Sequence, residues 1–352
     1  MLIFIPNIDF EKINKKTLFV ITRPFWSSKG WTNQSEEKSN WNISDDYQYT
    51  NEIFNAAVYL IPKPINTYTK SQLVEINSIC QAQNIKAVGY VSGDFGSDFG
   101  YFKNIIFFRM GGFKSKLSSN NKGFPVSLSD HFERIYNKKE IDVRTKSELP
   151  VIGFCGHADI SFVKKNKEYL KFLKENIKRF FKKPFRKDYE PLFASAFERA
   201  KLLQSFEQSN QVKTNFIYRK NYRAGANTEQ ERTKTTLEYY DNIKNSDYVV
   251  CVRGAGNFSV RLYETLMMGR IPVFVNTDCL LPFDDFIDWK KHVVWVEWEE
   301  RKKIAEVAFT SSSDYEKVVE KAQQAHLEWR KVPAPKRGEI VRKIATQTYF
   351  MK

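Results

Sequence analysis

The sequence predicts an α/β protein built from two domains. Its 352 residues are about twice the length of an ordinary domain of ~150 residues. Short apolar runs alternate with helical patterns along most of the chain, which is typical of parallel sheets. One stretch, residues 248–275, has the strand–helix–strand order of a complete βαβ unit. A hydrophobic content of 42% provides material for packed cores and argues against long disorder.

The elements expected in the first half are short. Apolar runs bounded by turn residues or prolines predict strands at residues 16–22, 56–61, 87–91 and 105–108. Residues 71–83 have helical spacing, with Thr69 or Ser71 as the N-cap.

The second half begins with a strand and a long basic helix. We expect, in order, a strand at 150–154, a Lys-rich amphipathic helix at 163–182, a break at 184–189, a helix at 192–206, a strand at 215–218 and a helix at 229–245. Two further helices are expected at 314–330 and 338–350, separated by Pro333 and Pro335.

The clearest pattern is the βαβ unit. A buried strand at 248–252 runs into a Gly-rich turn at 253–259. A helix follows at 260–268, where Gly269 ends it, and the next strand is 271–275. Because open α/β sheets bind ligands beyond the carboxyl ends of their strands, the Gly-rich turn is the expected place for a site.

The turn and the helix after it carry residues suited to a nucleotide. Ser259 is placed to cap the helix with its hydroxyl, and Gly254 lets the backbone approach an anion at the free N–H groups of the first turn. Arg261 and Glu264 share a helix face, where a guanidinium suits a diphosphate and a carboxylate suits ribose hydroxyls. An ordinary Arg–Glu surface pair is the alternative, so the spacing alone predicts only an anion site.

The segment from Cys251 to Trp289 resembles the exostosin-type glycosyltransferases of family 47. The shared pattern has a Cys-x-Arg-Gly turn, a Ser/Thr-x-Arg-Leu-x-Glu helix, a Gly-x-Ile-Pro-Val strand and a Leu-Pro-Phe loop closed by a Trp. Residues 55–62 and 151–156 match the family more weakly, and Thr265 stands where an alanine is common. The residues that fit the pattern are Cys251, Arg253, Gly254, Ser259, Arg261, Leu262, Glu264, Leu266, Gly269, Ile271, Pro272, Val273, Leu281, Pro282, Phe283, Asp288 and Trp289.

The resemblance implies a GT-B fold, in which two Rossmann-like domains face each other across a cleft. We expect residues 1–160 to form the acceptor-side domain and 161–330 the nucleotide-sugar domain, with 331–352 as a helix that packs back on the first domain. The family also implies a nucleotide-sugar donor such as a UDP-sugar, no cofactor and no bound divalent metal. The donor-binding residues expected in this chain are Arg219, Arg253, Gly254, Asn257, Ser259, Arg261 and Glu264.

The expected reaction is an inverting sugar transfer to a glycan, such as a bacterial surface or capsular polysaccharide. Arg261, helped by Arg253 or Arg219, would stabilise the leaving diphosphate. The partners expected are therefore a nucleotide-sugar donor and a glycan or lipid-linked glycan acceptor. Asp278, in the loop after residues 271–275, either touches the donor sugar or is a plain turn residue.

Such a transfer also needs a general base for the acceptor hydroxyl. We expect Asp94 or His157 in this catalytic role, because each closely follows a predicted strand. Asp98 and Asp159 lie in the same two loops and are further candidates. For each of these residues the alternative is an ordinary role in capping a turn.

The charge leaves a second function class open. The net charge is +15, from 56 Lys and Arg against 41 Asp and Glu, and such a surface attracts phosphates of some kind. The alternative function is therefore a non-catalytic GT-B-like or nucleic-acid-binding protein. The aromatic residues do not form an RNA-binding pattern, and we expect no nucleic-acid partner.

Composition also bears on the compartment. No run of about 18 apolar residues occurs, so we expect a cytoplasmic protein. The basic helix at 163–182 leaves open a peripheral contact at the inner face of the membrane, for which a solvated helix face is the simpler explanation. The cysteines lie singly in apolar segments and predict buried free thiols; they are Cys80, Cys155, Cys251 and Cys279.

Overall fold

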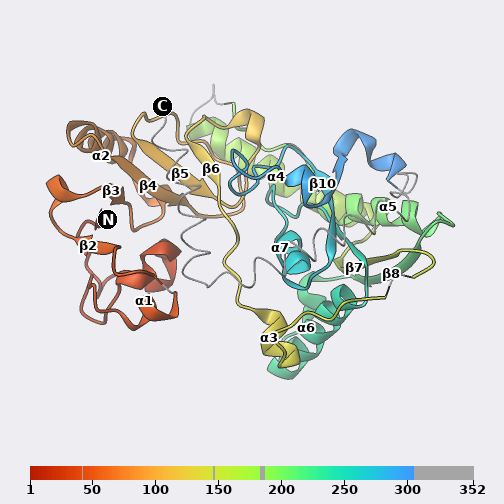
Figure 1. Ribbon diagram of the computed structural model, residues 1–352. Helices are drawn as coiled ribbons and strands as arrows, with labels where there is room; N and C mark the ends of the chain where they lie inside the picture. The colour runs from red at the N-terminus through yellow and green to blue at the C-terminus, as the bar shows by residue number, and fades with distance from the viewer. Residues whose placement is uncertain (42, 146, 183–186, 305–352) are drawn as a thin grey trace. The chain divides into compact units, whose positions relative to one another are not determined.

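Two sheets organise the chain. The computed structural model describes residues 1–304 except 42, 146 and 183–186 (Figure 1). Over this range eleven strands form one sheet of six strands and one of five. The described strand pairs are all parallel, and helices alternate with the strands. This confirms the predicted α/β fold with two Rossmann-like domains, as in GT-B proteins. The segment 331–352 and the helices expected at 314–330 and 338–350 lie outside the described residues.

Residues 1–62 form a compact unit with three strands. Their order is β2-β1-β3, with β1 at Leu2–Phe4, β2 at Gln48–Thr50 and β3 at Val58–Leu60. The short helix α1 spans Glu36–Asn40. The strand predicted at 56–61 is confirmed by β3.

The strand predicted at 16–22 is wrong. Short 3-10 helices occupy Lys15–Thr17 and Val20–Phe25 instead. Two local features favour this turn-like path over a strand. Pro24 cannot donate a ladder hydrogen bond, and the Thr22 hydroxyl donates back to the Phe19 carbonyl at 2.7 Å.

Residues 63–306 form the second unit, which begins with helix α2 at Lys70–Ala82. Thr69 caps α2 with a capping box to Gln72, which settles the choice left open between Thr69 and Ser71. Strands β4 at Lys86–Val91, β5 at Ile105–Arg109 and β6 at Asn121–Gly123 follow in the order β4-β5-β6. The strands predicted at 87–91 and 105–108 are thus confirmed.

The five-stranded sheet has the order β11-β10-β9-β7-β8. Its strands are β7 at Val151–His157, β8 at Lys213–Arg219, β9 at Tyr248–Cys251, β10 at Ile271–Asn276 and β11 at Val294–Glu297. β7 pairs with β8 and β9, because its continuous apolar run suits the centre of a parallel sheet. The domain limits themselves stay predictions.

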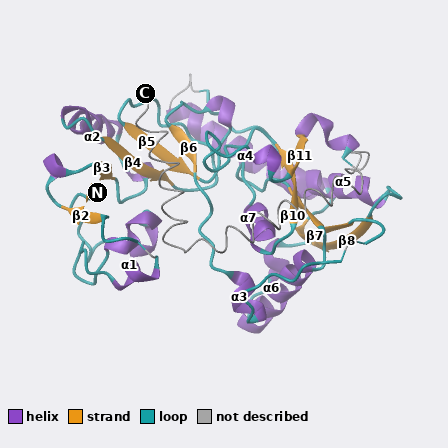
Figure 2. Ribbon diagram, viewed as in Figure 1, coloured by secondary structure: helices purple, strands orange, loops and turns teal. Residues whose placement is uncertain are grey.

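Helices cover both faces of this sheet (Figure 2). Neighbouring residues of β8 show the two faces, since the Phe216 ring contacts Phe206 of α5 while the Asn215 side chain donates to the carbonyl of Asn242 in α6. The helices are α3 at His131–Tyr136, α4 at Phe162–Lys182, α5 at Ser195–Glu207, α6 at Glu229–Lys244 and α7 at Val260–Met267. The expected helices at 163–182, 192–206, 229–245 and 260–268 are confirmed with small shifts at their ends.

Helix α7 packs on the sheet through Leu262 and Thr265, which are buried one turn apart. Leu262 joins a core that includes Cys251 and Phe274 from the flanking strands. Gly269 has φ +65°, as a helix-ending glycine requires. The four cysteines are all buried and free, which confirms the prediction from their spacing.

Candidate functional site

The topology of the second sheet creates a switch point between β7 and β9. The chain runs from β7 to β8 on one side and then returns to place β9 on the other side. Open α/β sheets bind ligands beyond the carboxyl ends of two strands with such an arrangement. The residues at the ends of β7 and β9 therefore define the candidate site.

Arg261 reaches from the first turn of α7 to this switch point. Its Nη2 donates to the carbonyl of Cys155 in β7 at 2.8 Å, and its Nη1 donates to the carbonyl of Val250 in β9 at 3.3 Å. The guanidinium also lies 4.2 Å from the centre of the Phe154 ring. Gly156 leaves the necessary room, because a Cβ there would be 2.7 Å from Arg261 Nη2.

Arg199 of α5 approaches the same strand ends and was missing from the sequence prediction. Its Nη1 donates to the carbonyl of His157 at 3.3 Å, and its Nη2 to the carbonyl of Arg253 at 2.9 Å. A Cβ on Gly254 would lie 3.3 Å from that Nη2, so this glycine permits the close approach. The one sequence signal for this role is an arginine on a helix whose neighbours Phe197, Ala200 and Leu203 are buried.

Arg253 adds a third guanidinium at the start of the Gly-rich turn. It lies between the rings of Phe113 and Phe193, at 5.0 and 4.6 Å, and its Nη2 donates to the carbonyl of Ala255 at 2.9 Å. Burial lowers the pKa of Arg253 to about 10, and it does the same for Arg199. The positive charge of Arg261 also contributes to the lowered pKa of Arg199.

These three side chains, the arginine cradle, carry positive charge that the described residues leave unpaired. No Asp or Glu of the described part of the chain forms an ion pair with Arg199, Arg253 or Arg261. The Nε of each is buried and has no hydrogen-bond partner there. Buried donors usually have a partner, so the cradle suits an anionic ligand.

Ser259 occupies the predicted N-cap position of α7, but its expected capping bond is wrong. No side-chain hydrogen bond from Ser259 caps the helix. Gly254 lies at the opposite end of the turn, against Arg199. Gly254 thus borders the cradle, and the contact of both residues with a donor stays a prediction.

Asn257 has a different environment from the one expected for a donor-binding residue. It is 1% exposed, and its amide nitrogen donates to the carbonyls of Gly112, Thr277 and Asp278 at 2.9–3.0 Å. Its amide oxygen accepts from the Thr277 hydroxyl at 2.6 Å. With both polar atoms occupied, the side chain is suited to joining the Gly-rich turn to two neighbouring loops.

Glu264 lies one turn after Arg261 in α7 and accepts from two tyrosines of α6. Tyr239 and Tyr240 donate to its carboxylate at 2.5 and 3.1 Å. Burial, with the nearby Glu264 carboxylate, raises the pKa of both hydroxyls, which therefore remain donors at neutral pH. A carboxylate that already accepts two hydroxyl bonds has the chemistry to accept from two ribose hydroxyls.

Arg219 at the end of β8 is bound by α6. Its Nη2 donates to the carbonyl of Thr235 and to the carboxylate of Glu238, each at 2.7 Å. The Arg219 charge is therefore balanced by Glu238, unlike the charges of the cradle. Its expected contact with a donor stays a prediction.

The two predicted general bases lie at the carboxyl end of one strand and in the loop after another. His157 is the last residue of β7, and its Nε2 is buried without a partner among the described residues. Burial lowers the pKa of this imidazole, which keeps it neutral at pH 7. Asp94 is exposed in the loop after β4, and its carbonyl would be 2.5 Å from a Cβ on Gly256. The loop of Asp94 thus lies against the Gly-rich turn.

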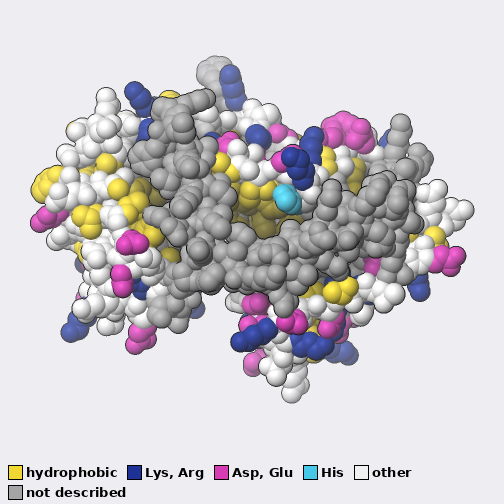
Figure 3. Space-filling model, in the orientation of Figure 1, with side chains coloured by type: hydrophobic (Ala, Val, Ile, Leu, Met, Phe, Trp, Pro, Cys, Tyr) yellow, Lys and Arg dark blue, Asp and Glu magenta, His cyan; other side chains and the backbone are white. Residues whose placement is uncertain are grey.

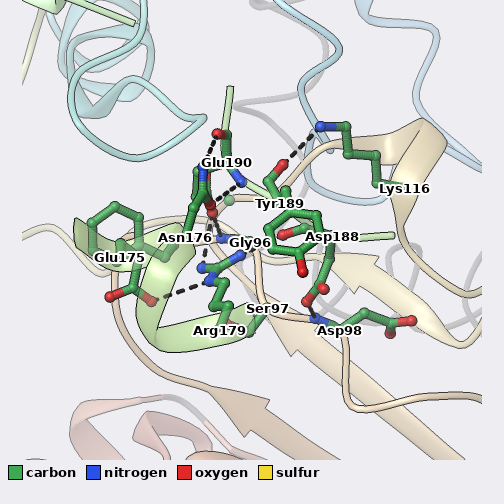
Figure 4. Close-up of polar contacts among 12 residues, drawn as sticks. Gly96, Ser97, Asp98, Lys116, Glu175, Asn176, Arg179, Asp188, Tyr189 and Glu190 are labelled. Atoms are coloured by element: carbon green, nitrogen blue, oxygen red, sulfur yellow. Dashed lines mark hydrogen bonds and ion pairs between the residues drawn. The ribbon is translucent and has the colours of Figure 1, made fainter. Parts of the chain in front are cut away.

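A buried ion pair fixes the loop that carries Asp94 (Figure 4). Glu190 accepts from the main-chain nitrogen of Gly96 at 2.6 Å and from Arg179 Nη2 at 3.1 Å. Nearby, the main-chain nitrogen of Asp98 donates to the carboxylate of Asp188 at 2.6 Å. Asp98 itself accepts from Ser118, so its carboxylate has a structural partner.

The loop after β10 borders a cavity of about 500 Å³. Trp289 and Trp295 line it together with carboxylates that include Asp284, Asp288 and Glu297. Asp278, at the same loop, has φ +62° and accepts from the Ser115 hydroxyl at 2.6 Å. Asn257 joins this loop to the Gly-rich turn.

The described residues contain neither a metal-ligand cluster nor a membrane-spanning helix. No group of three or more His, Cys, Asp or Glu side chains in this part of the chain is arranged to hold a metal ion. Among the same residues, no helix has the length and apolar content needed to span a bilayer. The expectations of no metal, no cofactor and a cytoplasmic location stay predictions.

Two family models match parts of the chain. Residues 148–309 match the Exostosin GT47 domain. The Aldehyde dehydrogenase family model matches residues 290–348, most of which lie outside the described residues.

Individual relatives match shorter stretches. The chain is 33% identical to a probable glucuronosyltransferase 47 A of Physcomitrium patens over 89 residues, 25% of this chain. It is 29% identical to Exostosin-1 of Drosophila melanogaster over 103 residues, which is 29% of the chain. It is 34% identical to the probable beta-1,4-xylosyltransferase IRX10L of Arabidopsis thaliana over 65 residues, which is 18% of the chain. The matched segments cover 19%, 13% and 16% of these relatives' own lengths.

Proposed function

We propose, from the match of residues 148–309 to the Exostosin GT47 domain, that the chain transfers a sugar from a nucleotide donor to a glycan acceptor. The donor that the site suits best is a UDP-sugar, and the acceptor class is a polysaccharide such as a bacterial surface or capsular glycan. The reaction inverts the anomeric centre and uses the residues of the chain without a resident metal.

The observation that carries this proposal is the charge of the arginine cradle at the switch point, which no Asp or Glu of the described residues pairs. Arg199, Arg253 and Arg261 supply three guanidinium groups beside the start of α7, whose first N–H groups also favour an anion. A diphosphate bound there brings the compensating negative charge. In the transition state, the same groups stabilise the charge that develops on the leaving nucleoside diphosphate.

Glu264 provides the second half of nucleotide recognition. Ribose presents two adjacent hydroxyls, and Glu264 already accepts from the hydroxyls of Tyr239 and Tyr240. When the nucleotide binds, the ribose hydroxyls replace one or both tyrosine donors at the carboxylate. This exchange keeps the carboxylate hydrogen-bonded in both states, which limits the cost of its burial.

The acceptor hydroxyl then needs a base. His157 is neutral at pH 7, and its Nε2 at the end of β7 has no partner in the described part of the chain, so it can accept a proton there. Asp94 is the alternative base, since its exposed carboxylate lies on a loop that contacts the Gly-rich turn at Gly256. The cavity lined by Trp289 and Trp295 fits a saccharide unit, because aromatic faces pack on sugar C–H groups while carboxylates accept from sugar hydroxyls.

The test is a thermal-shift panel of UDP-, GDP- and CMP-sugars on the full chain. At a ligand concentration of about 100 times Kd, the UDP-sugar should raise the melting temperature by about 5 °C. Arg261→Lys keeps a positive charge but loses the fork that binds two phosphate oxygens, and it should remove most of the shift. Arg144→Lys is the matched control, because Arg144 pairs with Asp247 just before β9, at the other end of the sheet.

Nucleic acid is the competing ligand in the same assay. On the face seen in Figure 3, the acidic and basic side chains of the described residues are interspersed rather than gathered into one basic area. A melting-temperature rise with RNA or DNA and none with any nucleotide sugar would replace the transferase with a nucleic-acid-binding function.

A further inference from the structure

Helix α4 presents an apolar stripe to solvent. Its exposed large apolar side chains are 47–80% accessible, and a helix turns about 100° per residue, which places all of them within an arc of roughly 100°. Single exposed apolar residues need no explanation, but a continuous stripe along one helix does. The members of this apolar stripe are Phe162, Val163, Leu170, Leu173, Ile177, Phe180 and Phe181.

A row of lysines borders the apolar stripe on one side. These side chains are all exposed, and within the described residues none of them forms an ion pair with an Asp or Glu. The same turn of about 100° per residue puts them on the arc next to the stripe. The members of this lysine row are Lys167, Lys171, Lys174, Lys178 and Lys182.

The third face of α4 is fixed to the body of the protein (Figure 4). Phe172 and Arg179 are buried on this face. Arg179 pairs with Glu190 and Glu175, and Asn176 exchanges two hydrogen bonds with the main chain of Glu190. Because these contacts set the rotation of the helix, the apolar stripe cannot turn inward.

We propose that α4 is a lipid-binding helix that lies in the plane of an anionic membrane surface. Its 21 residues, about 30 Å long, would place the apolar stripe among the acyl chains and the lysine row on the phosphate headgroups. The lysine row, which no described Asp or Glu pairs, favours anionic lipid over a neutral surface, because each lysine adds attraction close to negative headgroups. This inference is independent of the proposed transferase activity.

The experiment is flotation of the full chain with vesicles of phosphatidylcholine alone or an equal mixture of phosphatidylcholine and phosphatidylglycerol. Binding should be stronger to the mixed vesicles and weaken with added salt. Lys171→Gln/Lys174→Gln/Lys178→Gln should lower the partition coefficient on mixed vesicles about 100-fold, at about fivefold for each lysine. The control variant changes three exposed lysines outside α4, Lys70→Gln/Lys213→Gln/Lys234→Gln. Its partition coefficient on mixed vesicles should fall much less.

The apolar stripe is tested with Phe180→Ser/Phe181→Ser, which should weaken binding at least about tenfold. Val143→Ser/Leu149→Ser removes two exposed apolar side chains outside α4 and should bind as the unchanged protein does. Circular dichroism checks that each variant is folded. The inference is overturned if mixed vesicles bind no better than phosphatidylcholine, or if the stripe variant floats normally. A dimer in light scattering that the stripe variant dissociates would instead make α4 an interface between two copies.

Discussion

Replacing Glu190 with Gln removes the negative charge from the most enclosed ion pair near the loop of Asp94. The side chains of Glu190 and Arg179 are 1% and 3% exposed. Leaving a buried partner uncompensated costs about 3–5 kcal/mol. Glu175 still pairs with Arg179 at 3.1 Å, so we expect the lower limit, a loss of about 3 kcal/mol in the free energy of unfolding.

The assay is urea denaturation followed by circular dichroism, with the midpoint and slope measured for each variant. Glu175→Gln is the matched control, because it removes the same charge from the same arginine at a side chain that is 25% exposed. Solvent screens that pair, so its loss should cost about 1 kcal/mol or less. Equal losses for the two variants would refute the argument that burial of Glu190 decides the strength of this contact.

Three further outcomes follow from the site. Gly156→Ala adds a Cβ 2.7 Å from Arg261 Nη2, so the guanidinium must move. The UDP-induced rise in melting temperature should fall to less than half. A rise equal to that of the unchanged protein would contradict this geometry. Burial lowers the folded-state pKa of His157 below 6.5, so its stabilising contribution is present above about pH 6.5 and is lost as pH falls through the lower folded value. Between pH 7 and 5, the free energy of unfolding of His157→Asn should therefore fall less steeply than that of the unchanged protein. Identical slopes of stability against pH would contradict this role of His157. If Asp94 is the base, Asp94→Asn should lower kcat at least about 100-fold in a sugar-transfer assay yet leave the UDP-induced shift unchanged.

Local sequence signals were enough to predict most of the second sheet. The βαβ unit around α7 combines an apolar strand, a glycine that ends the helix and a second apolar strand. All three signals predict the same strand–helix–strand order. At residues 16–22 the apolar run was equally clear. There, Pro24 and the Thr22 hydroxyl favour 3-10 turns. A short apolar run alone does not distinguish a strand from such turns.

The candidate site was only partly accessible to sequence reasoning. Arg253 and Arg261 lie in the recognisable turn and helix, whereas Arg199 comes from α5, and only the packing of α5 on the sheet brings it to the Arg253 carbonyl. Asn257 is a residue for which the sequence predicted a role that its tertiary contacts do not favour. Its position in the turn predicted a ligand contact, but its amide is fully bonded to loops from Gly112 and Thr277, which no local pattern reveals.

A crystal structure of the full chain with UDP tests the central claim most directly. The account predicts diphosphate oxygens within hydrogen-bond distance of at least two of Arg199, Arg253 and Arg261, with the ribose hydroxyls on Glu264. UDP bound elsewhere on the chain, with the three guanidinium groups still bonded only to protein carbonyls, would contradict it.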